Sequence, residues 1–276
     1  PSDSLKMTGA VTIEAWVFPT GQGGSSWATI LNKEGEYELW RGPDGMLWYA
    51  VANSSPGWTG ISTGRAIPLN QWTHVALTYD GAWLRAYVNG VPVHSAPGSG
   101  VIGDHHTDMN ELRIGGRMAA SEYFKGSICE VRVWNVARSG VEIQANLGKR
   151  MGGTETGLVG YWRLDEGKGE IAADSSGQYN NGWLGGGVAA NAPVWVGSSA
   201  PVGHAQVRVV FQDVGGMDLV SVGNPANYRL VGSGGDGTFG DGNEAVLVPQ
   251  SVEFDAATAV AILRFGTPIG DDFYRC

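Results

Sequence analysis

Cysteine is scarce in this chain, and so are long apolar runs and basic residues. Cys129 and Cys276 are the only cysteines among 276 residues, so a disulfide framework is excluded and the core must hold the fold together. No run of about 18 apolar residues occurs, which argues against membrane insertion. The 18 Lys and Arg face 27 Asp and Glu, a formal net charge of −9. Because no Lys/Arg stripe offsets this acidity, nucleic acid is not expected as a partner.

Glycine and aromatic residues are abundant instead. The 44 glycines follow no fixed period, which excludes a collagen and fits many short strands joined by tight turns. Hydrophobic residues make up 42% of the chain, so a disordered protein is excluded as well. At 276 residues the chain is longer than one β-sandwich requires, and two domains are expected.

Alternation of residue types predicts antiparallel strands in the first two thirds of the chain. In residues 11–18 one face is aliphatic and the other carries Trp16 and Phe18, so both faces are expected to be covered. Turns at Asp80-Gly81 and Asn89-Gly90 predict a meander of three strands. Strands are expected at 37–40, 46–51, 72–79, 84–88, 91–93, 111–114, 126–134 and 158–164.

One short helix is predicted, at 139–147. Ser139 stands at its N-cap and Glu142 at the capping-box position three residues later. Short strands, a single helix and the lack of a strand–helix–strand rhythm predict an all-β, antiparallel two-sheet sandwich for residues 1–196.

A second, smaller β domain is predicted for residues 204–276. Residues 196–204 have the composition of a linker. Beyond them, five short strands with turn signals between them are expected at 207–211, 227–231, 244–248, 251–254 and 259–265. This spacing is typical of an Ig-like sandwich, either complete or truncated at the end of the chain.

Five ordered segments of the first domain resemble the laminin-G-like (concanavalin A-like lectin/glucanase) jelly-roll family. They are 11–17 (VTIEAWV), 71–81 (QWTHVALTYDG), 84–90 (LRAYVNG), 126–135 (GSICEVRVWN) and 160–167 (GYWRLDEG). The resemblance implies a jelly roll for adhesion or glycan recognition in a secreted or cell-surface protein, commonly with one structural calcium, and no enzyme. Cys129 departs from the pattern, since an acidic residue usually stands there. Residues 224–228 resemble Ig-like modules of bacterial surface proteins.

The calcium that the resemblance implies has its best candidate ligands in the loop 174–182. Asp174 and Asn181 offer oxygen atoms, and Asp165 can add a carboxylate. The alternative is a turn in which Asp174 accepts hydrogen bonds from N–H groups of its own loop.

Two other polar loops are weaker metal candidates. The loop 234–244 is acidic and glycine-rich but lacks the ligand spacing of an EF-hand, so a surface loop is favoured. His105 and His106 are adjacent, and adjacent side chains in an extended loop diverge. A solvated loop is therefore the favoured interpretation there too.

A glycan hydrolase would need two carboxylates on either side of a cleft. The nearest pattern is the alternation of Glu34, Glu36 and Glu38, which lacks the Glu-x-Asp-x-x-Glu spacing of related sandwich glucanases. We interpret these residues as solvated glutamates at a strand edge.

Aromatic residues in loops are the expected recognition surface. Trp27, Trp58 and Tyr123 stand among Gly, Ser and Pro, and sugar rings stack on exposed aromatic faces. A module that binds carbohydrate or matrix ligands is therefore predicted. A structural spacer without a ligand, favoured if all three rings are buried, and a glycan-active hydrolase are the alternatives.

Overall fold

The computed structural model describes residues 2–23, 27–117, 121–196, 206–210, 222–232, 245–255, 260–264 and 274–275. The chain divides into two compact units, residues 1–198 and 199–276. Most of the expected linker, residues 197–204, lies outside the described residues. No helix in the described ranges is long and apolar enough to cross a membrane.

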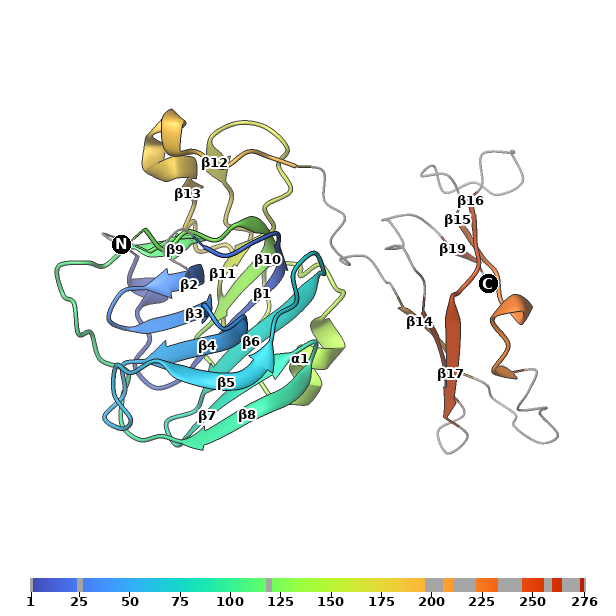
Figure 1. The fold of residues 1–276 in the computed structure, drawn as a ribbon, viewed down its shortest axis with the longest axis horizontal. Coiled ribbons are helices and arrows are strands. Elements are labelled where there is room, and N and C mark those ends of the chain that lie inside the picture. Colours follow the sequence, from blue (N-terminus) through green and yellow to red (C-terminus); the bar gives the residue numbers. More distant parts are fainter. Residues whose placement is uncertain are drawn as a thin grey trace. The chain divides into compact units, whose positions relative to one another are not determined.

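The first unit is an all-β sandwich of two antiparallel sheets, consistent with a jelly roll (Figure 1). One sheet has five strands in the order β5-β4-β3-β2-β9, and the other has six in the order β11-β10-β1-β6-β7-β8. The strands are β1 (Val11–Pro19), β2 (Ala28–Lys33), β3 (Tyr37–Arg41), β4 (Met46–Val51), β5 (Ile61–Ala66), β6 (Thr73–Tyr79), β7 (Trp83–Val88), β8 (Val91–Pro97), β9 (Leu112–Ile114), β10 (Gly126–Trp134) and β11 (Leu158–Trp162).

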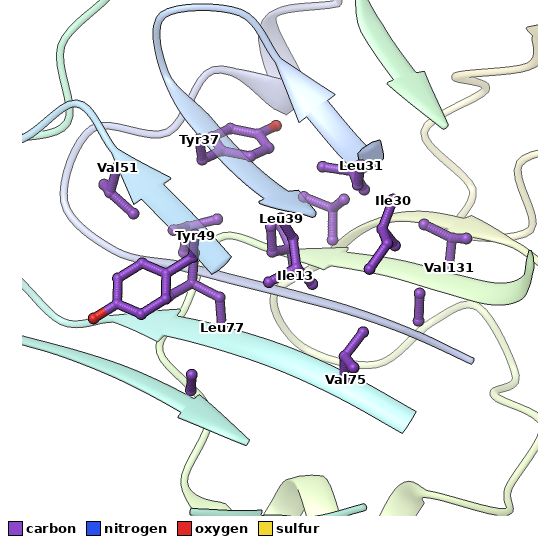
Figure 2. Close-up of a cluster of buried hydrophobic side chains, with 14 of the residues drawn as sticks. Ile13, Ile30, Leu31, Tyr37, Leu39, Tyr49, Val51, Val75, Leu77 and Val131 are labelled. Atoms are coloured by element: carbon purple, nitrogen blue, oxygen red, sulfur yellow. The ribbon is translucent and has the colours of Figure 1, made fainter. Parts of the chain in front are cut away.

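The main core fills the space between the two sheets (Figure 2). Ile13 and Val75 enter it from the six-stranded sheet, and Leu39 and Tyr49 enter it from the five-stranded sheet. Each is fully or almost fully buried. Since side chains alternate across a strand, the neighbours of these residues point to the two outer faces of the sandwich.

The predicted meander is confirmed as β6, β7 and β8, which pair in sequence order. Asn89 and Gly90 both have positive φ, 50° and 74°, as a tight two-residue hairpin turn requires. The Asn89 side chain also accepts a hydrogen bond from the His74 N–H at 2.9 Å, which fixes the turn against β6.

The predicted helix is confirmed as α1 (Gly140–Asn146), and both hydrogen bonds of the Ser139–Glu142 capping box are present. Its buried Ile143 packs with Ala76 of β6 and Tyr87 of β7. The helix therefore covers part of the outer face of the six-stranded sheet, as the aromatic second face of residues 11–18 predicts.

A two-stranded extension follows β11. Its strands β12 (Ile171–Ala172) and β13 (Gly182–Trp183) pair antiparallel. The short 3-10 turns η2 (Leu184–Gly187) and η3 (Ala189–Asn191) come next, and the Trp195 indole N–H is donated to the Gly169 carbonyl at 2.8 Å.

The second unit contains two three-stranded antiparallel sheets, β14-β18-β17 and β16-β15-β19. Their strands are β14 (Gln206–Val210), β15 (Leu230–Gly232), β16 (Ala245–Leu247), β17 (Ser251–Asp255), β18 (Val260–Arg264) and β19 (Tyr274–Arg275). Part of the strand expected at 227–231 is a 3-10 turn, Pro225–Asn227, capped by Asn224. The Ig-like assignment stays a prediction. The acidic loop 234–244 and Cys276 lie outside the described residues.

Candidate functional site

Three tryptophans gather on the outer face of the five-stranded sheet. Trp40 of β3 lies opposite Trp48 of β4, and their rings stack with centroids 6.3 Å apart and planes 25° apart. Trp27, just before β2, meets them edge-on at 6.2 and 5.5 Å. Because Leu39 and Leu47 point into the core, these rings point outward. We call Trp27, Trp40 and Trp48 the tryptophan face.

A polar contact fixes the orientation of one of these rings. The Trp48 indole N–H is donated to the Asp44 carboxylate, 3.1 Å from Oδ1. The segment that carries Trp27 is tied to the sheet by Gln22, whose side chain binds Arg41 and the Pro43 carbonyl. Trp40 is 8% exposed, whereas Trp27 and Trp48 are half-buried. Partly open, oriented indole rings are what a stacked sugar ring needs.

Beside the tryptophan face, three carboxylates converge on Arg117. Its guanidinium forms a two-point ion pair with Glu34, with both N···O distances 2.7 Å. Glu122 follows at 3.3 Å and Glu38 at 3.9 Å. The Glu34 hydrogen bond is the largest contribution to a raised pKa of Arg117. The arginine therefore stays charged and links the segment after β9 to the turn between β2 and β3.

Glu38 is the most perturbed carboxyl of this cluster. Its pKa is raised to about 7, mainly by burial and to a lesser degree by the charges of Glu34 and Glu122, against the opposing charge of Arg117. The Asn32 side chain donates a hydrogen bond that lowers it only in part. A carboxyl with such a pKa beside aromatic rings marks a candidate functional site.

The interpretation of Glu34, Glu36 and Glu38 as solvated was wrong, because all three are no more than 4% exposed. Lys33, itself buried, pairs with Glu36, and Arg117 covers Glu34 and Glu38. Arg117 lies 83 residues from Glu34 along the chain, so no local pattern could have linked them.

The three aromatic residues predicted as the recognition surface lie in loops, and none is fully buried. Tyr123 is 59% exposed, and Trp27 and Trp58 are half-buried. A Cβ at Gly23 would come within 2.1 Å of the Trp27 carbonyl and 2.7 Å of the Tyr123 carbonyl. Trp27 and Tyr123 are therefore neighbours through their backbones.

Trp40 and Trp48 were missed, although the sequence holds a signal for them. Each stands next to a core leucine in a strand beside the Asp44-Gly45 turn. Period-two alternation places both on the outer face of the hairpin. Loop position alone did not find them, because strand residues supply two of the three rings.

The predicted calcium ligands are engaged in other contacts. Asp174 accepts hydrogen bonds from the N–H groups of Tyr161, Ser176 and Asn180 at 2.8–2.9 Å. The Asn181 side-chain oxygen accepts the Asp174 N–H. This is the turn geometry weighed as the alternative.

Asp165 lies apart from that turn, paired with Arg150 at 2.9 Å and with Arg163 at 3.4 Å. Within the described residues, no three His, Cys, Asp or Glu side chains group as metal ligands. The residues proposed for calcium therefore do not fit such a site, and the calcium itself stays a prediction.

His106 and Cys129 also have structural explanations. The His106 backbone N–H is donated to Asp104 at 2.9 Å, and its ring lies 3.8 Å from Glu34. Cys129 is a buried free thiol, and burial raises its pKa to about 12. A thiol of that pKa is a poor nucleophile at neutral pH.

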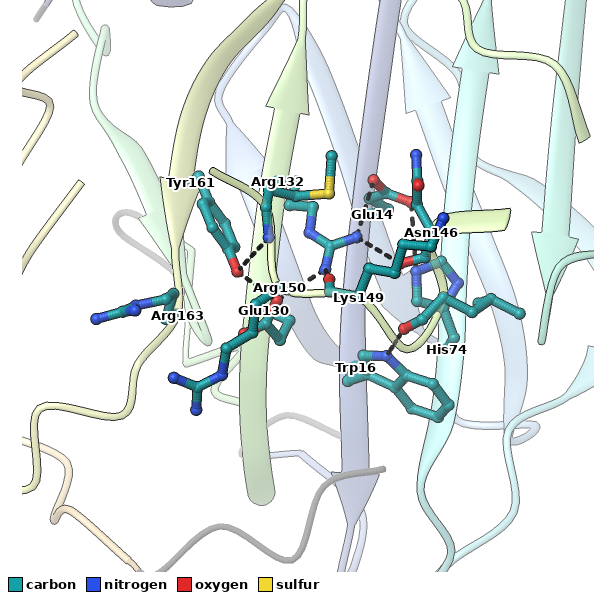
Figure 3. Close-up of polar contacts among 12 residues, drawn as sticks. Glu14, Trp16, His74, Glu130, Arg132, Asn146, Lys149, Arg150, Tyr161 and Arg163 are labelled. Carbon is teal, nitrogen blue, oxygen red and sulfur yellow. Dashed lines mark hydrogen bonds and ion pairs between the residues drawn. The ribbon is translucent and has the colours of Figure 1, made fainter. Parts of the chain in front are cut away.

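The outer face of the six-stranded sheet carries a second charged network (Figure 3). Arg132 donates to Glu130 at 2.7 Å and to the carbonyls of Asn146 and Lys149 at 3.1 and 2.6 Å. It also lies 3.6 Å from Glu14. Because the chain after α1 lies over this network, we call it the covered face.

Glu14 is the carboxylate at the centre of the covered face. Burial alone would raise its pKa, but the close contact with His74, whose Nε2 lies 3.3 Å from the carboxylate, and the charge of Arg132 outweigh it, so the pKa falls to about 2. The Trp134 indole N–H is also donated to Glu14, at 3.0 Å. The Glu14 carboxylate is therefore ionised at neutral pH, with His74, Arg132 and Trp134 around it.

A laminin-G-like sequence profile, described as Concanavalin A-like lectin/glucanases superfamily, matches residues 1–144, just over half of the chain. The chain belongs to this superfamily. The expected family is thereby confirmed for the first domain, and the sandwich of antiparallel sheets agrees with it.

Two curated relatives match smaller parts of the chain, and one solved structure matches a larger part. Pappalysin-1 of Mus musculus is 34% identical over 93 residues, 33% of this chain, and that of Homo sapiens is 31% identical over 91 residues, 32% of this chain. This chain spans about 6% of the length of each. A solved structure from Bacteroides ovatus, described as a proposed carbohydrate-binding protein, is 27% identical with a TM-score of 0.55, covering 66% of this chain and 53% of its own.

Proposed function

We propose that this protein is a non-catalytic carbohydrate-binding module of a secreted or cell-surface protein, and that a glycan stacks on the tryptophan face. The observation that carries the proposal is the cluster of Trp27, Trp40 and Trp48 on the outer side of a sheet. Membership of a lectin-containing superfamily and the likeness to the Bacteroides ovatus protein support it.

Physical chemistry favours a sugar as the occupant of this face. A pyranose ring has a C–H face that packs on an indole ring and an edge of hydroxyls that seek hydrogen bonds. Half-buried Trp27 and Trp48 offer the ring surface. Asp44 holds Trp48 in place and is itself exposed, so its carboxylate can accept from a sugar hydroxyl.

The non-catalytic part of the proposal rests on how the nearby carboxylates are engaged. The raised pKa of Glu38 is the one feature that favours a hydrolase, because a general acid needs such a pKa. Glu38 is 3% exposed, however, and Arg117 holds its neighbour Glu34 at two points. A general acid must reach the glycosidic oxygen, and this one is enclosed by protein.

The test is a glycan array probed with the full 276-residue chain, with and without EDTA. We expect saturable binding to one class of glycan, and the comparison with EDTA shows whether that binding depends on calcium. If the protein bound none of the glycans, the proposal would be contradicted and the structural spacer would be favoured. Release of reducing ends from a bound glycan, abolished in Glu38→Gln, would instead show a hydrolase.

A further inference from the structure

Trp27 differs from the other two rings of the tryptophan face in what holds it in place. Trp40 and Trp48 lie opposite each other in the paired strands β3 and β4. Trp27 precedes the first residue of β2 and stands outside the strand pairing. Its ring nevertheless lies edge-on to both partners, with centroids 6.2 and 5.5 Å away. Contacts outside the sheet must therefore hold the chain that carries it.

The segment that leads into β10 supplies such contacts on both sides of Trp27. Before Trp27, the Thr20 N–H is donated to the Lys125 carbonyl at 2.8 Å. After it, the Thr29 N–H is donated to the Glu122 carbonyl at 3.4 Å. The chain on either side of Trp27 is therefore attached to one short segment, and the position of the ring depends on where that segment lies.

The side chain of Arg117 ties this segment to the sheet. Its Nε and Nη2 each donate to Glu34 at 2.7 Å, and its Nη1 donates to Glu122 at 3.3 Å. Glu34 is 4% exposed and lies in the turn after β2, so it is the fixed anchor, whereas Glu122 belongs to the segment. A guanidinium in a two-point ion pair has a defined orientation. We call Arg117, Glu34 and Glu122 the Arg117 clamp.

We propose that Arg117 is a positioning residue of the glycan site, and that its clamp on Glu122 holds Trp27 within the tryptophan face. This inference rests on the proposed function, because it concerns the same three rings. Arg117 acts through Trp27 and not on the glycan itself, since its nitrogens donate to carboxylates. A ring that is already in place loses less conformational freedom when a glycan binds, which strengthens binding.

The clamp can be tested without a glycan by near-UV circular dichroism, which reports on fixed aromatic packing. Arg117→Gln should change the tryptophan signal of the folded full chain. In a Trp27→Ala background the same substitution should leave the signal unchanged, because the ring that moves is absent. Arg117→Lys keeps the charge and should retain part of the wild-type signal. Arg113→Gln is the matched control, since Arg113 of β9 pairs with Glu111 at 2.6 Å on the same sheet, and it should match wild type.

The effect on binding is measured with the oligosaccharide that gives the strongest signal on the glycan array, titrated into each variant by isothermal calorimetry. Arg117→Gln should weaken binding about fivefold or more in the wild-type background and less than about twofold in Trp27→Ala, because effects that act through one another are not additive. Arg117→Lys should restore part of the affinity. Glu122→Gln loosens the clamp at its partly exposed end and should act in the same direction.

Thermal unfolding shows which variants are folded, and Glu122→Gln takes the place of Arg117→Gln if the latter is not. An unchanged near-UV signal in a folded clamp variant, or equal effects with and without Trp27, would overturn the inference. Lack of glycan binding by the wild-type protein would instead overturn the proposed function, and the near-UV experiment would still decide whether Arg117 positions Trp27.

Discussion

On the outer face of the six-stranded sheet the chain covers its own charges, whereas on the outer face of the five-stranded sheet it leaves aromatic rings partly open. Arg132 and Glu14 are both about 1% exposed and lie under the segment after α1. Arg117 remains 29% exposed, and half-buried tryptophans lie beside its cluster. Both outer faces contain ion-pair networks, but only the face of the five-stranded sheet leaves aromatic surface open to a ligand.

The comparison teaches that buried charge by itself does not mark a binding site. The covered face has ion pairs that satisfy its charges internally and attach the segment after α1 to the sheet. On the other face, the Arg117 cluster plays a similar attaching role for the segment after β9. What distinguishes that face is the partly open aromatic surface next to the cluster.

The largest effect expected is the loss of Arg132. Arg132→Met leaves Glu14 and Glu130 without their cation in a buried place, and we expect it to lower the free energy of unfolding by about 3–5 kcal/mol. The matched change Arg117→Met leaves the buried Glu34 without its partner, but Arg117 is 29% exposed and water can partly replace it, so the cost should be smaller, about 1–3 kcal/mol. Urea denaturation of both variants measures the difference in the free energy of unfolding. Equal losses in the two variants would contradict the contrast between the two faces.

The second effect is a dependence of stability on acid pH through Glu14. Its folded pKa of about 2 lies below the ordinary glutamate value of 4.5, so the carboxylate stabilises the fold above pH 4.5. That contribution, about 3 kcal/mol, is lost as pH falls from 4.5 through 2. Glu14→Gln should be less stable than wild type at pH 7 and should lack this part of the acid transition in urea denaturation. An unchanged acid transition would contradict this role.

Glu38 should show the opposite sign. Its folded pKa of about 7 lies above 4.5, so the folded state binds the proton more tightly, and stability falls as pH rises from 4.5 to 7. The full difference is about 2–3 kcal/mol. Glu38→Gln should therefore match wild type near pH 4.5 and exceed it at pH 8. A variant less stable than wild type at pH 8 would contradict the assignment.

A smaller effect concerns the buried thiol. In a Cys276→Ser background, Cys129 should resist iodoacetamide at pH 8 in the folded protein and react once urea unfolds it, because burial raises its pKa to about 12. Rapid labelling of the folded protein would show that the part of β10 around Cys129 opens to solvent. Mass spectrometry after timed quenching gives the rate.

Features specified by neighbouring residues could be predicted from the sequence. The turn at Asn89-Gly90 needs positive φ at both positions, and the Ser139–Glu142 capping box spans three residues, so both were found. Alternation in residues 11–18 likewise indicated a strand covered on both faces. Each of these signals lies within one element and does not depend on the topology.

Contacts between distant segments could not be predicted. Arg117 meets Glu34, and Arg132 meets Glu14, only because the sheet order brings their strands or loops together. Trp40 is an intermediate case, since alternation places it on an outer face but does not say that Trp27 covers it. Of the three rings of the candidate site, the sequence therefore identified only Trp27.

The central claim is tested most directly by titrating a glycan from the array into wild type, Trp48→Ala and Trp83→Ala. Trp83 is a 44% exposed tryptophan of β7, in the other sheet, and serves as the matched control. We expect Trp48→Ala to lose about 2 kcal/mol of binding free energy, close to thirtyfold in Kd, while Trp83→Ala binds as wild type does. Equal affinity of Trp48→Ala and wild type, with both folded, would contradict the claim.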